Sequence, residues 1–136
     1  MRKPRAIVLD SWAVLAYFQG EPSAASMEGI ITAALKRDIP LLMSVISAGE
    51  VWYVLARELS PEKAEEGLAD LRSWGVELVD IDLKLALAGA GLKAKYKMSS
   101  ADAIAAALTQ SRKADLVTGD NDFRQVEAMI KIEWLK

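Results

Sequence analysis

The sequence predicts a single three-layer α/β/α domain in which helices cover both faces of a five-stranded, mostly parallel sheet. Short continuous apolar runs alternate with longer segments of helical character along the 136 residues. Such runs are typical of strands buried on both faces, and their alternation with helices is typical of a parallel sheet. No linker, repeat or low-complexity stretch interrupts the alternation, so we expect one domain over residues 1–136.

The first predicted strand is followed by two predicted helices. Ala6–Leu9 is a continuous apolar run, and the apolar segment 11–18 after it predicts a short helix. Gly20 and Pro22 end this helix, because both residue types interrupt helical structure. We expect the second helix over residues 24–37.

The second predicted strand, 41–44, leads into another pair of helices. Ser47 and Glu50 have the S-x-x-E spacing of a capping box, which predicts the start of a helix that continues to residue 59. Ser60 precedes Pro61, a residue type favoured at the first helical position, and this pair predicts a helix that ends near residue 74.

The second half of the chain predicts three further strands and the helices between them. Gly75 ends the preceding helix, and Asp82 and Ser99 are residue types favoured at helix N-caps. We therefore expect a strand over 76–81, a helix over 82–96, an Ala-rich helix over 99–113, a strand over 116–118, a short helix and a strand over 130–134.

Composition narrows the chemistry that is available. Seventeen basic and nineteen acidic side chains give a net charge of −2, which argues against binding nucleic acid by bulk positive charge. The chain has neither Cys nor His, which excludes disulfides, thiolate metal sites, imidazole-bound zinc and a Ser-His-Asp triad. Any catalysis must therefore use carboxylates, hydroxyls, Lys, Arg, Tyr or a metal ion held by oxygen ligands.

Two features of the chain bear on its location. No apolar run approaches the roughly 18 residues of a membrane span. The basic N-terminus is followed by too few apolar residues for a signal peptide. We therefore expect a cytoplasmic protein with no membrane association.

Five acidic residues are predicted to meet at one edge of the sheet. Asp10 follows the first strand, Asp120 and Asp122 follow the fourth, and Glu50 and Asp102 lie in the first turns of helices near the central strands. Ligands of open α/β sheets bind at the carboxyl ends of the strands, where the strand order reverses. Carboxylates that share a pocket repel each other unless a cation neutralises them, and Mg²⁺ or Mn²⁺ suits such oxygen ligands.

Each of these acids also has a purely structural interpretation. Glu50 and Asp102 stand three residues after a Ser, at the capping-box position, where the helix dipole favours acids whatever the function. Asp10 and Asp120 could cap the helices that follow them. The five acids together are a more specific signal of a functional site than any single one of them. The two acids that flank the end of the third strand are excluded from the site, because they lie away from the expected reversal: Asp80 and Asp82.

Four motifs, taken in order, resemble those of PIN domains. They are V-L-D-S near the N-terminus, a Ser and Glu pair after the second strand, S-x-x-D-A-I-A-A-A before the fourth strand and T-G-D-N-D-F after it. Within that family the chain is similar to the compact toxins of VapC type, and the resemblance covers essentially its whole length. It implies a parallel sheet of order 3-2-1-4-5 and a metal-dependent ribonuclease.

The resemblance also implies which residues form the site. Matched by position, four acids make its centre: Asp10, Glu50, Asp102 and Asp120. One further acid and two hydroxyl residues support them: Asp122, Ser11 and Thr118. One residue departs from the pattern, because the bulky Trp12 stands where a small or polar residue is common.

Residues and resemblance together predict an endoribonuclease that depends on Mg²⁺ or Mn²⁺. We expect the metal to lower the pKa of a bound water, and Glu50 to orient or deprotonate that water. The expected metal ligands are Asp10, Asp102 and Asp120. Three lysines ahead of the last helix motif are interpreted as an RNA-binding rim or, alternatively, as a solvated helix end: Lys93, Lys95 and Lys97.

The resemblance further implies the toxin of a type II toxin–antitoxin pair. Its partners would be an RNA substrate, a small antitoxin that blocks the site and a second copy of the chain. A catalytically silent PIN-like interaction module would keep the same fold. A Mg²⁺-dependent phosphoreceiver or a D-x-D phosphatase would require two acids at the end of the first strand. Asp10-Ser11-Trp12 contains only a single acid.

Overall fold

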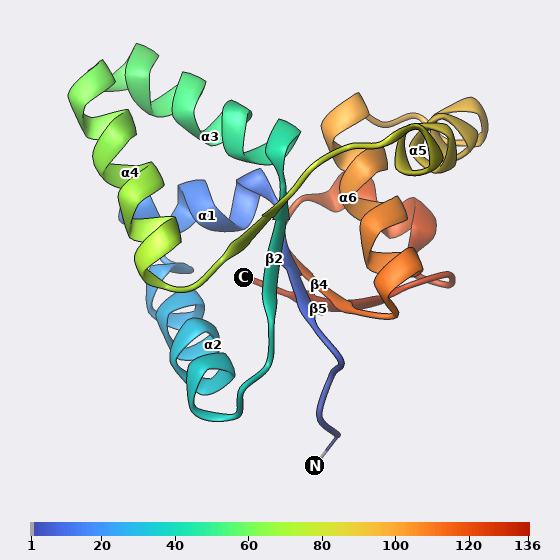
Figure 1. Ribbon diagram of the computed structural model, residues 1–136, viewed down its shortest axis with the longest axis horizontal. Helices are drawn as coiled ribbons and strands as arrows, with labels where there is room; N and C mark the ends of the chain where they lie inside the picture. The colour runs from blue at the N-terminus through green and yellow to red at the C-terminus, as the bar shows by residue number, and fades with distance from the viewer. Residues whose placement is uncertain (1) are drawn as a thin grey trace.

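The computed structural model describes residues 2–136 and has the predicted layers, with a central sheet and helices on both sides (Figure 1). The elements in chain order are β1 (Ile7–Leu9), α1 (Ser11–Phe18), α2 (Ala24–Lys36), β2 (Leu41–Ser44), α3 (Val45–Glu58), α4 (Pro61–Ser73), β3 (Glu77–Val79), α5 (Leu83–Lys95), α6 (Ser100–Arg112), β4 (Asp115–Thr118), the 3₁₀ helix η1 (Asn121–Val126) and β5 (Lys131–Trp134).

All strand pairs of the sheet are parallel, and the strand order is β3-β2-β1-β4-β5, which confirms the predicted topology. The chain builds outward from β1 through β2 to β3, and then returns to the other side of β1 for β4 and β5. The strand order therefore reverses between β1 and β4. Leu9 pairs with Val117 in this central pair, so the next residues, Asp10 and Thr118, follow in register at the carboxyl ends of the two strands.

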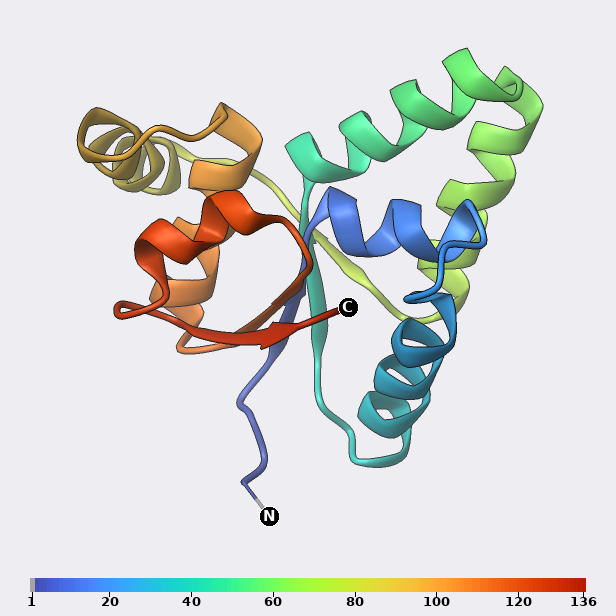
Figure 2. The same ribbon diagram turned by 180° about the vertical axis from the view of Figure 1, so that it is seen from behind.

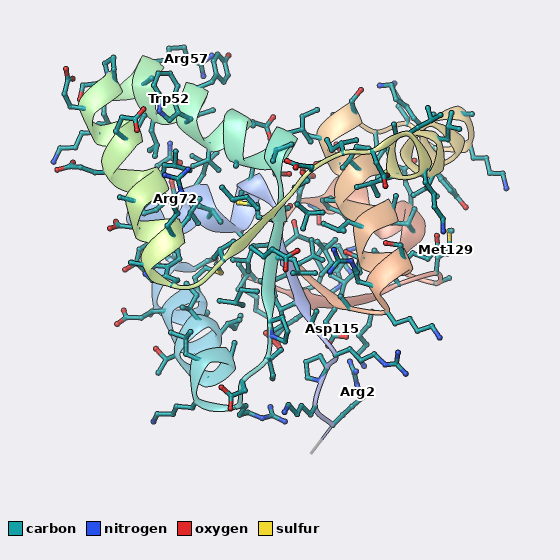
Figure 3. The ribbon with its side chains drawn as sticks, in the orientation of Figure 1. Arg2, Trp52, Arg57, Arg72, Asp115 and Met129 are labelled. Atoms are coloured by element: carbon teal, nitrogen blue, oxygen red, sulfur yellow. The ribbon has the colours of Figure 1, made fainter. Side chains whose placement is uncertain are left out.

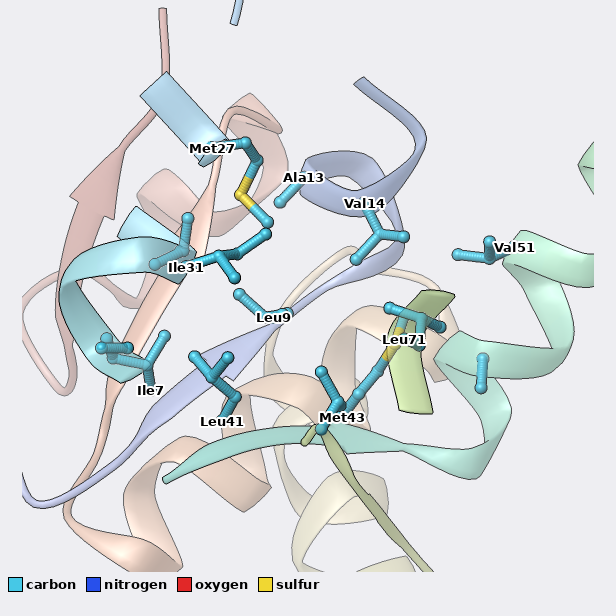
Figure 4. Close-up of a cluster of buried hydrophobic side chains, with 14 of the residues drawn as sticks. Ile7, Leu9, Ala13, Val14, Met27, Ile31, Leu41, Met43, Val51 and Leu71 are labelled. Atoms are coloured by element: carbon cyan, nitrogen blue, oxygen red, sulfur yellow. The ribbon is translucent and has the colours of Figure 1, made fainter. Parts of the chain in front are cut away.

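Alternate side chains of the strands enter two separate apolar cores. Leu9 and Met43 belong to the core under α1, α2, α3 and α4, which Figure 4 shows in close-up. Val8, Leu42 and Leu116 belong to the core under α5, α6 and η1, which form the layer at the left of Figure 2. Each fully buried Leu or Met contributes roughly 1.5–3 kcal/mol to stability, so burial on both faces fixes the position of the central strands.

Polar contacts at the surface attach peripheral parts of the chain to these layers. The Arg2 guanidinium donates two hydrogen bonds to the Asp115 carboxylate, at 2.6 and 2.5 Å, and so ties the segment before β1 to the start of β4 (Figure 3). The Trp52 indole donates to Glu65 at 3.1 Å and links α3 to α4. Within residues 2–136, no helix has both the length and the apolar character that a membrane span needs.

The start of α3 differs from the prediction. Ser44, the last residue of β2, is the N-cap, because its hydroxyl accepts a hydrogen bond from the Ser47 backbone N–H at 3.1 Å. The strand therefore passes directly into the helix, and the capping box predicted at Ser47 and Glu50 is wrong. Glu50 consequently lies in the second turn of α3 rather than in the first, which removes the capping interpretation of this acid.

The assignment of this cap can be tested by mutation. Ser44→Ala removes the acceptor for the Ser47 N–H and should lower the free energy of unfolding by about 1 kcal/mol in denaturant titrations. Ser60→Ala, which removes the equivalent cap of α4, is the matched control and should cost a similar amount. A neutral Ser44→Ala combined with a destabilising Ser47→Ala would instead favour the capping box.

Candidate active site

Asp10 lies at the carboxyl end of β1 and is 2% exposed. It caps α1, because one carboxylate oxygen accepts from the Ala13 N–H at 2.8 Å, and its other oxygen accepts from the Thr118 hydroxyl. The pKa of Asp10 is raised to about 7, mainly by burial; the two hydrogen bonds oppose the rise, and the charges of Asp102 and Asp120 contribute to it. Asp10 is therefore a helix cap that also lies near other acidic side chains.

Asp102 is brought to the same place by α6. Ser99 caps this helix and accepts from the Asp102 N–H at 3.1 Å, which puts Asp102 in the first turn as the sequence predicts. Its side chain is buried. The pKa of Asp102 is raised to about 6, mainly by burial and also by the charges of Asp120, Glu50 and Asp122. The cap and the acidic cluster again involve the same residue.

Asp120 and Asp122 approach from the turn after β4. The Asp120 N–H donates to the Thr118 hydroxyl oxygen at 3.0 Å, and the Asp122 N–H donates to the Asp120 carboxylate at 2.9 Å, which starts η1. Asp102, Asp120 and Asp122 each place a carboxylate oxygen within 4.8 Å of the other two. Asp102 is buried, Asp120 is half-buried and Asp122 is exposed, so the group opens toward solvent on one side.

Glu50 and Ser11 complete the acidic neighbourhood from the other side. The Ser11 hydroxyl donates to the Glu50 carboxylate and thereby joins the first turn of α1 to the second turn of α3. The negative charge of Glu50 contributes to the raised pKa of Asp102, so the two carboxylates interact. All seven residues that the sequence places in the centre or beside it therefore gather around the ends of β1 and β4.

The donor set of this cluster fits a hard divalent cation. The three carboxylates within 4.8 Å of one another offer oxygen ligands only, which is the ligand type that Mg²⁺ and Mn²⁺ prefer. This group of three contains Asp122, which the sequence places in a supporting role, and Asp10 lies beside it rather than within it.

The predicted lysine rim and the excluded acids lie where the helix assignments put them. Lys93, Lys95 and Lys97 are exposed around the end of α5, and the Lys93 ammonium donates to the Met98 carbonyl at 3.3 Å. Asp82 caps α5 through the Leu85 N–H at 2.8 Å, as its position predicts. Together with Asp80, it lines a different surface pocket, between α5 and α6.

Sequence reasoning missed Gln125, which connects two parts of the site. Its side-chain amide accepts from the Lys97 N–H at 3.0 Å and donates to the Lys97 carbonyl and to the Asp122 carbonyl, both at 2.9 Å. The loop ahead of Asp102 is thus attached to the turn that carries Asp122. An exposed Gln in a short helix gives no sequence signal for such a role.

Comparison with known proteins identifies a matching family. The family model described as PIN domain matches residues 7–129. A search of curated proteins gives no match.

Solved structures share the fold at low sequence identity. The structure of VapBC2 from Rickettsia felis bound to a DNA fragment from its promoter superposes with a TM-score of 0.77 at 17% identity, covering 96% of this chain and 99% of that chain. VapC20 from Mycobacterium tuberculosis, described as a sarcin–ricin loop cleaving toxin, gives 0.70 at 18% identity over 89% and 95% of the two chains. DNA-bound VapBC from Salmonella typhimurium gives 0.71 at 19% identity over 94% and 96%.

The raised pKa values of Asp10 and Asp102 predict how stability depends on pH in EDTA. Both folded-state pKa values, about 7 and about 6, lie above the unfolded value of 3.8. On acidification from neutral pH, the folded protein therefore binds more protons than the unfolded chain does. The free energy of unfolding should therefore rise as the pH falls from about 8 to about 5. Urea titrations of the wild type and Asp10→Asn would measure this, and the variant should show a flatter dependence. A wild type that loses stability over this range would contradict the electrostatic account.

Proposed function

Because this chain belongs to the PIN domain family, we propose that it is a metal-dependent endoribonuclease and the toxin of a type II toxin–antitoxin pair. The observation that carries the proposal is the convergence of Asp102, Asp120 and Asp122 beside Asp10 at the point where the strand order reverses. The fold shared with VapC20, described as a toxin that cleaves the sarcin–ricin loop, supports this choice of activity.

The acidic residues have distinct roles in this proposal. Asp102 and Asp120 bind Mg²⁺ or Mn²⁺ together with Asp10, and Asp122 supports the same ion or a second, weaker one. When bound, the ion lowers the pKa of a water molecule and offsets the charge of the phosphodiester. Thr118 orients Asp10 through its hydroxyl, a contact of the kind that fixes metal ligands in place.

Glu50 is the proposed proton acceptor of the reaction. Its carboxylate is half-buried and oriented by the Ser11 hydroxyl, and its charge acts on Asp102. The hydrogen bond restricts the side chain to one direction, which a group that orients or deprotonates the attacking water requires. Attack of water on phosphorus, with cleavage of the P–O3′ bond and protonation of the departing 3′ oxygen, would leave a 5′-phosphate and a 3′-hydroxyl.

Lys93, Lys95 and Lys97 are the proposed phosphate contacts of the RNA. Lys93 and Lys95 lie in the last turn of α5, and Lys97 lies in the loop that leads to Asp102, where Gln125 ties the Lys97 backbone to the turn that carries Asp122. Local positive charge beside a metal-binding centre compensates for the overall net charge of −2. Single-stranded or looped RNA fits such an open rim better than a duplex does.

The proposed partners are a cognate antitoxin and a second copy of the chain. The solved structures of similar fold include VapBC complexes and a toxin–antitoxin complex from Klebsiella pneumoniae, which supports an antitoxin. Exposed apolar side chains on α3 and α5 supply the kind of surface that a subunit contact covers: Val45, Ile46, Leu83 and Leu87. A toxin that acts on RNA would work in the cytoplasm.

The first test of the proposal is RNA cleavage by variants that differ in one carboxylate. Asp102→Asn should lower the cleavage rate of single-stranded RNA in Mn²⁺ by more than about 100-fold, because it removes a charged ligand. Asp82→Asn, which changes a helix cap at a different pocket, is the matched control and should keep nearly full activity. Equal loss in both variants would place the site elsewhere, and an inactive wild type that still folds would favour the silent interaction module.

The second test is metal binding followed by thermal unfolding. Mn²⁺ at about 100 times its dissociation constant stabilises a protein by roughly 2.7 kcal/mol, which is several degrees for a chain of this size. Asp10→Asn should melt at the same or a higher temperature than the wild type in EDTA and should gain less from Mn²⁺. An Asn oxygen can still accept from the Ala13 N–H, so loss of the cap contributes little. Equal shifts in both proteins would remove Asp10 from the metal site.

A further inference from the structure

Trp12 lies directly against Gly119. A Cβ atom added to Gly119 would lie 2.3, 2.4 and 2.7 Å from three atoms of the six-membered ring of the Trp12 indole. Real Cβ atoms essentially never approach other atoms this closely, so the indole occupies the space that a side chain at position 119 would need. The backbone of Gly119 is not in the left-handed region, unlike that of Gly20 and Gly75. The indole contact therefore accounts for glycine at this position.

Gly119 separates two residues of the proposed site. Before it, Thr118 donates its hydroxyl to Asp10, and its carbonyl accepts from the Leu135 N–H at 2.8 Å. After it, the Asp120 N–H donates to the Thr118 hydroxyl oxygen at 3.0 Å. A glycine has more backbone freedom than any other residue, so packing on Gly119 adds to the two hydrogen bonds that fix Asp120.

We propose that Trp12 is a positioning residue of the active site, whose indole packs on Gly119 and holds the Thr118–Asp120 segment in place. The inference rests on the proposed function for its metal and RNA readouts. The contact between Trp12 and Gly119 does not depend on that function. Trp12 thus acts through Gly119 and Asp120 and needs no contact with the substrate.

The surroundings of Trp12 indicate how the contact can be broken. The side chain is half-buried against the core under α1 to α4, and it also lines a pocket of about 450 Å³ together with Leu15, Ala16 and Pro22. The indole therefore has free space on the pocket side. A methyl group at position 119 would displace the ring toward this pocket, so Gly119→Ala and Trp12→Ala disrupt the same contact.

The experiment compares Trp12→Ala, Trp12→Phe, Gly119→Ala and the double variant Trp12→Ala/Gly119→Ala. In EDTA, hydrogen exchange of the Asp120 amide should be at least about threefold faster in Trp12→Ala, because the segment opens more often. The dissociation constant for Mn²⁺ should rise about tenfold, as for other residues that orient metal ligands. In RNA cleavage kcat should fall while KM changes little, and Trp12→Phe should restore part of each effect.

The double variant tests whether the two residues share one contact. Gly119→Ala should weaken Mn²⁺ binding in the wild-type background but should add little in the Trp12→Ala background, where the ring is gone. Strictly additive losses would show that Gly119 acts independently of Trp12 and would overturn the proposal. If Trp12→Ala does not fold, the same comparison is made with Trp12→Phe, Gly119→Ala and the double variant of these two substitutions.

Two matched controls separate positioning from general loss of stability. Trp74→Ala removes another half-buried tryptophan from the same core, where it packs on Tyr17 and Phe18. Gly67→Ala adds a methyl group 2.9 Å from a Leu55 side-chain atom, away from the acids. Both should lower the melting temperature without changing the dissociation constant for Mn²⁺. If the dissociation constant rises equally in Trp74→Ala, the effect of Trp12→Ala is explained by lost stability alone, and the proposal is overturned.

Failure of this inference is distinguishable from failure of the proposed function. If the wild type binds no Mn²⁺ and cleaves no RNA, the proposed function fails, and Trp12 has no active site to position. The Asp120 amide then still reports whether the indole holds the segment. If the wild type binds Mn²⁺ and the Asp120 amide exchanges equally fast in Trp12→Ala, the proposed function stands and the positioning role is overturned.

Discussion

The hydrogen bond from the Thr118 hydroxyl to the Asp10 carboxylate joins the two central strands at the point where the strand order reverses, and the rest of the site is arranged around it. The parallel register places the two residues side by side. Asp10 then caps α1, and Thr118 accepts from the Asp120 N–H. One contact between β1 and β4 thus sets the positions of the helix that carries Ser11 and of the turn that carries Asp120 and Asp122.

The same contact shows how the fold tolerates several buried acids. Burial and mutual repulsion raise the pKa values of Asp10 and Asp102, whereas hydrogen bonds from Thr118, Ala13 and Ser99 act against the rise. The opposing contributions leave both pKa values near neutrality rather than far above it. Repulsion remains a cost to stability, and such a cost is typical of sites whose geometry serves chemistry rather than stability.

Much of the fold follows from local sequence, whereas the details of the site depend on distant contacts. Continuous apolar runs located the strands, because both faces of this sheet are buried. The sequence predicts the wrong start for α3, because Ser47 and Glu50 have the spacing of a capping box. In the structure, Ser44 ends β2 and also caps α3. The strand order came from family resemblance. A carboxylate oxygen of Asp122 lies within 4.8 Å of those of Asp102 and Asp120 because of the 3₁₀ turn after β4. Gln125 binds the Lys97 backbone, which lies in a loop far away in sequence. No local sequence pattern predicts either contact.

The contact between Trp12 and Gly119 has an evolutionary consequence. Two positions far apart in the chain share a single volume, so neither can change freely while the other stays the same. A lineage that reduces residue 12 gains room for a side chain at 119, whereas a lineage that enlarges residue 119 first displaces the indole from the backbone. The order of substitutions therefore matters, because the path that begins at 119 passes through an intermediate with a displaced indole. Among relatives of this chain, an aromatic residue at position 12 should accompany glycine at position 119.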